Sequence, residues 1–94
     1  MAQFDVKIAD TKKGSRVWLQ HTARFGFEGG ARYTISYSSD AIAIMLDPEG
    51  KRKVTAAKGG IIDLTSQKVT ATLGREGVAV VHVGPDCLVI KRRG

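Results

Sequence analysis

The sequence predicts a small, mainly β domain with two short helices, folded as a β-barrel-like unit. Apolar and polar residues alternate in several short segments, which is the pattern of half-buried strands. Glycine-rich and Asp/Pro turns separate these segments, and no apolar stripe is long enough for an extended helix. The chain has 94 residues, 43% of them apolar, which suffices for one hydrophobic core. A single domain is therefore predicted over residues 1–94.

The first half of the chain divides into five predicted elements. Alternate residues are apolar in segment 3–9, which predicts an N-terminal strand. A second strand is predicted at 16–20, and segment 21–27 has the length of one or two helical turns before a glycine pair ends it. Aromatic and β-branched residues at 32–37, then turn residues, then an apolar run at 41–46 predict a hairpin.

The second half repeats this order after a basic connector at residues 47–60. The connector opens with Asp-Pro-Glu-Gly, a type I turn pattern, and its Lys-Arg-Lys-Val-Thr segment is consistent with an exposed strand. A strand is predicted at 61–64 and a short helix at 67–73, where Thr and Ser provide candidate caps. Segments 77–83 and 87–91 flank a Gly-Pro-Asp turn and predict a second hairpin.

The order of strand, short helix and hairpin coincides when residues 16–46 are laid over residues 62–92, an offset of 46. The match is one of pattern, because only Asp40/Asp86 and Ile44/Ile90 are identical pairs. It predicts two pseudo-symmetric repeats, in a pseudo-dimeric monomer or a homodimer of such chains. The shared core predicted by this alignment consists of Trp18, Phe27, Ile35, Ile44, Leu64, Leu73, Val81 and Ile90.

The stretches VWL (17–19), ARFGF (23–27) and YTI (33–35) resemble the AbrB-like swapped-hairpin families, and within them the SymE-like toxins. AbrB-like proteins pair two copies of the unit in one interleaved barrel-like dimer, and they bind DNA through basic residues around the first strand and the following loop. The resemblance implies that this chain holds both copies in tandem. It implies a DNA-facing region that contains Lys12, Lys13, Arg16 and Arg24.

The net charge of +6, from 15 Lys and Arg against 9 Asp and Glu, favours a phosphate-rich partner. We expect DNA or RNA binding by a transcriptional regulator or antitoxin-type protein of bacterial or phage type. Alternatives are a small protein-interaction module, such as a phage-type inhibitor of a host protein, and a SymE-like ribonuclease toxin. The predicted nucleic-acid-binding residues are Lys12, Lys13, Arg16, Arg24, Lys51, Arg52, Lys53 and Lys58.

The clusters also have other interpretations. We expect Arg16, Arg24 and residues 51–53 to form one continuous positive surface, but charged residues at 51–53 also fit an edge strand protected against aggregation. The basic tail at 91–93 fits a solvated terminus. Tyr33 and Tyr37 are the aromatic residues best placed to stack on bases.

The sequence contains no pattern typical of catalysis or metal binding. Its two histidines, His21 and His82, lack metal-ligand spacing, and Cys87 is the single cysteine. We therefore expect no enzyme activity, no metal and no cofactor. No apolar run has the length of a membrane span and no signal-peptide pattern is present, so no membrane association and a cytoplasmic location are expected.

Overall fold

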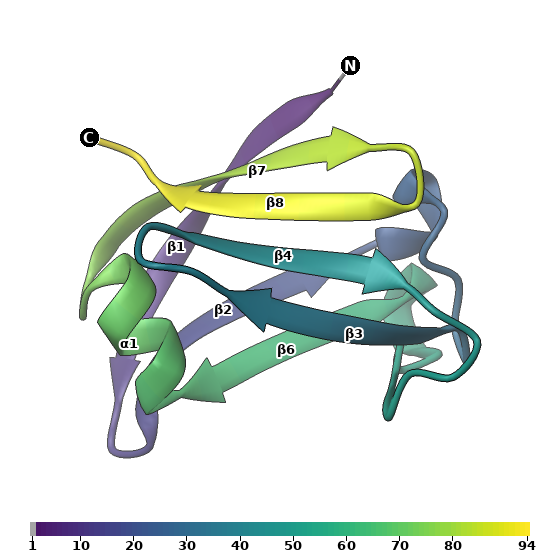
Figure 1. Cartoon of the computed structure of the whole chain (residues 1–94), viewed down its shortest axis with the longest axis horizontal. Coiled ribbons are helices and arrows are strands. Elements are labelled where there is room, and N and C mark those ends of the chain that lie inside the picture. Colours follow the sequence, from purple (N-terminus) through teal and green to yellow (C-terminus); the bar gives the residue numbers. More distant parts are fainter. Residues whose placement is uncertain (1) are drawn as a thin grey trace.

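Eight antiparallel strands curl into one half-barrel sheet in the computed structural model, which describes residues 2–94 (Figure 1). The mainly β, barrel-like class predicted from the sequence is confirmed. The strands lie side by side in the order β5-β3-β4-β8-β7-β1-β2-β6. Along the chain the elements are β1 Gln3–Thr11, β2 Gly14–Gln20, η1 Thr22–Phe25, β3 Arg32–Tyr37, β4 Ala41–Leu46, β5 Arg52–Lys53, η2 Ala57–Gly59, β6 Ile61–Ser66, α1 Gln67–Leu73, β7 Gly77–Gly84 and β8 Cys87–Arg92.

Of the two predicted helices, only the second is an α-helix. Helix α1 spans Gln67–Leu73 as expected, and the Ser66 hydroxyl caps it by accepting a hydrogen bond of 3.3 Å from the Val69 N–H. The prediction of a helix at 21–27 is wrong, because this segment contains only the 3₁₀ turn η1. His21 and Gly26 bracket that turn in left-handed conformations, with φ of 56° and 89°, so a right-handed helix cannot continue in either direction.

The core is formed by the inward-facing residues of the strands together with α1. Six of the eight predicted core residues are buried: Phe27, Ile44, Leu64, Leu73, Val81 and Ile90. Ile35 packs against this core but is only partly buried, whereas the prediction for Trp18 is wrong, since Trp18 is partly exposed and does not belong to the core. On β2, Val17 and Leu19 face the core, so strand alternation places Trp18 on the outer face.

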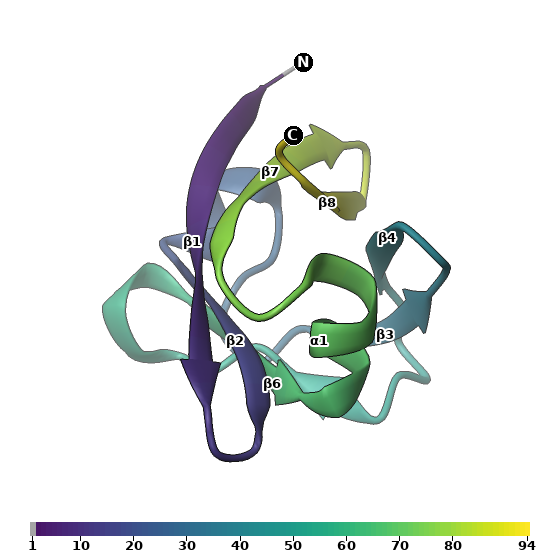
Figure 2. The same ribbon diagram turned by 90° about the vertical axis from the view of Figure 1, so that its left-hand side faces the viewer.

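Helix α1 covers one mouth of the curled sheet, as the end-on view in Figure 2 shows. Val69 and Leu73, four residues apart, turn toward the core and are fully buried. The Arg92 guanidinium donates hydrogen bonds to the carbonyls of Leu73 (2.6 Å) and Glu76 (2.7 Å) at the C-terminal end of the helix. On the other side, the Ser15 hydroxyl donates to the Gly74 carbonyl at 2.6 Å. These contacts hold the helix between β2 and β8.

Candidate functional site

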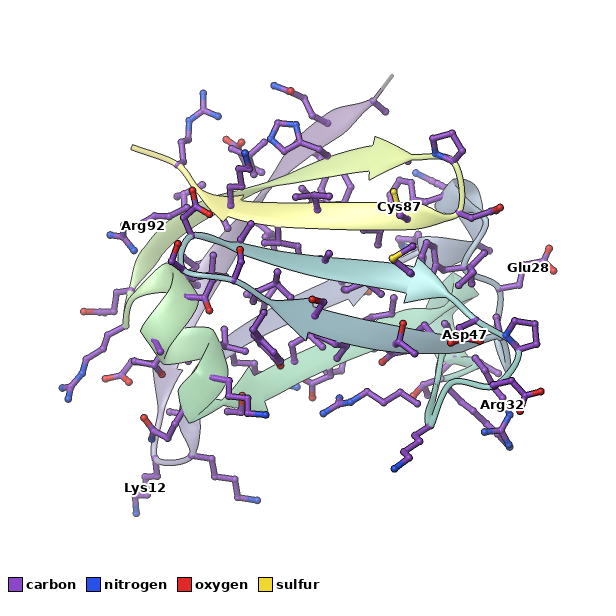
Figure 3. All side chains as sticks on the ribbon, in the orientation of Figure 1. Lys12, Glu28, Arg32, Asp47, Cys87 and Arg92 are labelled. Atoms are coloured by element: carbon purple, nitrogen blue, oxygen red, sulfur yellow. The ribbon has the colours of Figure 1, made fainter. Side chains whose placement is uncertain are left out.

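The predicted basic residues lie in three parts of the fold. The first, which we call the hairpin cluster, consists of Lys12 and Lys13 in the β1–β2 turn and Arg16 on β2; these three residues line one shallow groove. Lys12 and Lys13 are exposed, and Figures 2 and 3 show this turn extending past α1 into solvent. Neither lysine forms an ion pair within residues 2–94.

The turn that carries the hairpin cluster depends on Gly14. Its φ of +122° is in a region that side chains disfavour, and a Cβ at this position would clash with the backbone of Ser66. Glycine therefore lets the β1–β2 turn lie directly against the end of β6. This contact holds the turn that carries the exposed lysines against β6.

The outer face of β2 and β6 carries a polar contact that the sequence prediction missed. The Arg16 guanidinium lies 4.4 Å from the centre of the Trp18 ring and donates two hydrogen bonds of 3.1 Å to the Asp63 carboxylate. Both charged side chains are 40% exposed. Arg16 is thus already neutralised, whereas Lys12 and Lys13 are not. The sequence feature that predicts this outer face is the placement of Arg16 and Trp18 on either side of the apolar Val17.

The other predicted basic residues lie at some distance from the hairpin cluster. Lys51 and Arg52 line a different cavity, and Lys53, the next residue of β5, points to the opposite face of that strand. Arg24 in η1 and Lys58 in η2 belong to two turns that contact each other beyond the far end of β2. Arg16, Arg24 and residues 51–53 thus lie on different elements, and their expected continuity stays a prediction.

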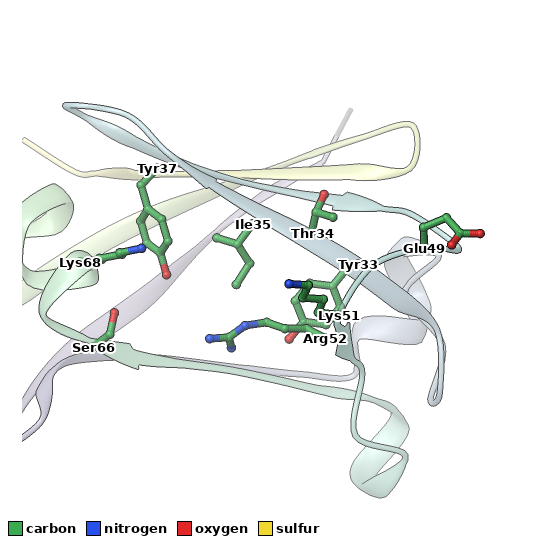
Figure 4. Close-up of a pocket in the computed structure, with 9 residues that line it drawn as sticks. All are labelled: Tyr33, Thr34, Ile35, Tyr37, Glu49, Lys51, Arg52, Ser66 and Lys68. Carbon is green, nitrogen blue, oxygen red and sulfur yellow. The ribbon is translucent and has the colours of Figure 1, made fainter.

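A cavity of about 580 Å³ lies in a gap between β3 and β6 that we call the seam (Figure 4). Its inner side is formed by Tyr33, Ile35 and Tyr37, which alternate along β3. Lys51 and Arg52 line it on the β5 side, and Lys68 at the start of α1 lines it at the opposite end. Lys68 and the partly exposed Ile35 are absent from the predicted site, because only the pairing of distant strands creates the seam.

The seam carries more positive than negative charge. Within the part of the chain that the structure describes, no carboxylate forms an ion pair with Lys51, Arg52 or Lys68, and Glu49 is the single acidic residue of the lining. The Lys68 ammonium lies 5.6 Å from the centre of the Tyr37 ring. Burial raises the pKa of the Tyr33 phenol above its ordinary value of 10.0, and the neighbouring Arg52 guanidinium opposes this rise. The cavity therefore favours an anionic or hydrogen-bonding occupant over a cation.

Two classes of feature are absent from residues 2–94. No group of three or more His, Cys, Asp or Glu side chains is placed to hold a metal ion. No helix there is both long enough and apolar enough to cross a bilayer. Comparison with known proteins finds no matching family model, curated protein or solved structure. The resemblance to AbrB-like and SymE-like proteins thus stays a prediction from the sequence.

Proposed function

We propose that this chain is a nucleic-acid-binding module that contacts phosphates through the hairpin cluster. The observation that carries the proposal is the β1–β2 turn, which presents Lys12 and Lys13, two exposed lysines without carboxylate partners within residues 2–94. Exposed lysines on a projecting turn supply contacts to the phosphates of a duplex. Arg16, stacked on Trp18, lies beside the lysines in the same groove. An AbrB-like regulator or antitoxin is the kind of protein that this arrangement suits.

The strand pairing supports the further proposal that the chain is a tandem of two AbrB-like units. The β6, α1, β7, β8 order repeats the β2, η1, β3, β4 order, and β2 pairs with β6 while β4 pairs with β8. The offset of 46 also relates two pairings across the sheet: Lys7 with Val78, and Lys53 with Arg32. In this scheme β5 is a shortened equivalent of β1.

The proposal is tested by fluorescence anisotropy with labelled duplex DNA, duplex RNA and single strands over a range of salt concentrations. Replacing both lysines, Lys12→Glu and Lys13→Glu, should weaken binding of all duplex sequences and lower the salt slope by about 1.8, roughly 0.9 for each lost phosphate contact. The matched control is the pair Lys7→Glu and Lys91→Glu. It changes the net charge equally on exposed strand positions away from the turn.

Two results would overturn the proposal. The first is the absence of DNA and RNA binding by the unmodified chain at low salt, where charges are least screened. The second is equal weakening by the two lysine pairs, because this would assign the affinity to net charge rather than to the β1–β2 turn.

A further inference from the structure

Strand β1 shows how this barrel accommodates a strand between two others. It pairs antiparallel with β7 through residues 3–8 and then with β2 through residues 9–11. Where β1 reaches Val83, the Val83 N–H donates a hydrogen bond of 2.9 Å to the Ala2 carbonyl. The whole edge of β7 is thus covered by a single extended segment.

The seam has the same construction, but its strand is incomplete. Strand β5 pairs with β3 only at Arg32 and Tyr33, and Thr55 then forms a bridge to Ile61 at the start of β6. One segment therefore contacts both sides of the seam at this end, which shows that the gap there is one strand wide. From Thr34 to Tyr37 no residue within 2–94 pairs with the seam side of β3.

The backbone groups along this uncovered edge face the seam in a regular pattern. Arg32 and Ser38 form their backbone hydrogen bonds with the β4 side, at 3.0 Å to Asp47 and 2.9 Å to Ala41. Because such bonds alternate along an antiparallel strand, the backbone N–H and C=O groups of Ile35 and Tyr37 point the other way. The backbone N–H and C=O groups of these two residues are thus hydrogen-bond donors and acceptors without a strand partner within residues 2–94.

The opposite edge of the seam has the same property. Ile61 exchanges backbone hydrogen bonds of 2.9 and 3.0 Å with Thr55, so its backbone groups face the seam. By the same alternation, those of Asp63 and Thr65 also face it. An extended segment entering antiparallel to β3 would therefore find hydrogen-bonding partners on both sides.

The side chains of the seam define the chemistry of that segment. A residue opposite Ile35 would place its side chain among Ile35, Tyr33 and Tyr37, which line the cavity from β3. At the equivalent place in the other slot, β1 puts Phe4 opposite Val81. Lys51, Arg52 and Lys68 surround this apolar centre with cations that lack carboxylate partners within residues 2–94. An extended segment that places an apolar residue opposite Ile35 and carries acidic residues elsewhere along its length is complementary to this lining.

We propose that the seam captures an extended acidic segment of a partner protein, which adds as a strand antiparallel to β3 and completes the barrel. This is strand addition, in which backbone hydrogen bonds give affinity and alternate side-chain pockets give selectivity. The site is separate from the hairpin cluster and does not depend on nucleic-acid binding. Charge alone also attracts single-stranded nucleic acid, but a nucleic-acid strand lacks the alternating N–H and C=O groups at strand spacing that would pair with two β edges.

The direct test is amide hydrogen exchange measured by NMR with a defined probe. The probe is a labelled synthetic peptide, Asp-Ala-Gln-Phe-Asp-Glu, whose four central residues copy residues 2–5. In the unliganded chain, the amides of Ile35 and Tyr37 should exchange faster than those of Thr34 and Ser36, which are bonded to β4. Saturating peptide should slow the Ile35 and Tyr37 amides at least about tenfold and leave Thr34 and Ser36 little changed.

Two controls separate strand addition from attraction by charge. A peptide of the same sequence, N-methylated on alternate residues that face β3, keeps its charge but loses its ladder donors, so it should bind at least about tenfold more weakly. In the protein, Arg52→Glu should weaken the parent peptide about tenfold or more, whereas Lys53→Glu should have a much smaller effect. The two variants change the net charge equally, and only Arg52 lines the cavity.

Four results would overturn the proposal: no peptide binding, equal binding of the N-methylated peptide, unchanged exchange at Ile35 and Tyr37, or competition by a short oligonucleotide that itself protects these amides. The Lys12→Glu and Lys13→Glu variant should retain peptide binding. Because that variant leaves the residues of the seam unchanged, its nucleic-acid binding tests the proposed function and its peptide binding tests the seam.

Discussion

The slot between β7 and β2 is filled by nine residues of β1, whereas within residues 2–94 the slot between β3 and β6 holds only the two residues of β5 and the Thr55 bridge. Gln3 and Phe4 continue β1 along β7, whereas the chain just before β5 is folded into a turn in which the Gly50 N–H donates a hydrogen bond to the Asp47 carbonyl. A turn replaces a strand there, so one edge of the barrel is left without a partner.

Gly50 fixes the place where the incomplete strand begins. A Cβ on this residue would clash with the backbone of Tyr33, so glycine allows the chain to cross close over β3. The Arg32 guanidinium donates a 2.9 Å hydrogen bond to the Gly50 carbonyl at the same crossing. The chain reaches the seam side of β3 only at Arg52, which leaves Ile35 and Tyr37 uncovered.

The largest expected difference in unfolding free energy is between substitutions at Ile44, which lies in the paired part of the sheet, and Ile35, which faces the seam. The two residues are direct cross-strand partners. Ile44 is fully buried between β3 and β8, so Ile44→Ala should lower the free energy of unfolding by about 2–5 kcal/mol. Ile35 faces the seam cavity, and Ile35→Ala should cost about 1 kcal/mol. Urea denaturation measures both values. Equal losses would mean that the seam is packed as tightly as the closed side.

A smaller loss of unfolding free energy is expected at the contact that joins α1 to Arg92 of β8. Arg92→Met removes two hydrogen bonds to the carbonyls of Leu73 and Glu76, and we expect a loss of about 1–3 kcal/mol in the same urea measurement. The control is Arg93→Met, which breaks an exposed ion pair with Asp5 and should cost less than about 1 kcal/mol. Similar losses in both variants would contradict the assigned role of Arg92.

The smallest expected effect is on how stability depends on pH. It tests whether the Tyr33 phenol, at one end of the seam, is buried. The folded chain raises the pKa of Tyr33, so above the ordinary pKa of 10.0 the unfolded state loses its proton more readily than the folded state. The stability contributed by the neutral phenol is therefore present below pH 10.0 and is lost as the pH rises through the folded-state pKa. The Tyr33→Phe variant should lose less stability than the parent between pH 9 and 11, measured by denaturation at each pH. A parallel decline would place the Tyr33 hydroxyl in solvent.

The sequence predicted the strands well because most of them have one buried face. Alternation identified β1 and β2, and turn residues identified both hairpins. The prediction from the sequence fails where the repeat alignment conflicts with the local pattern. The alignment matches Trp18 with Leu64 and so predicts that Trp18 lies in the core, whereas alternation puts Trp18 with Arg16 and Gln20 on the outer face of β2. The helix predicted at 21–27 was wrong because the left-handed conformation of His21 has no signature in its residue type.

The candidate sites were predictable to different degrees. Lys12 and Lys13 belong to one tight turn, so their proximity follows from the sequence alone. The seam requires knowledge of which strands are neighbours, and it joins Tyr37 to Lys68 across thirty positions that no local pattern connects. No charge or periodicity in either segment predicts the missing strand between them.

The position of β1 between β7 and β2 also has a consequence for synthesis of the chain. Strand β1 is made first, yet its main partner is β7, and β4 likewise pairs with β8. Residues 77–84 must therefore leave the ribosome before β1 finds its principal partner, and β4 has only β3 beside it until β8 follows. Such long-range pairing slows folding and exposes unpaired edges while translation continues. The nascent chain thus has a period in which its first strand is open to chaperones or to pairing with another copy.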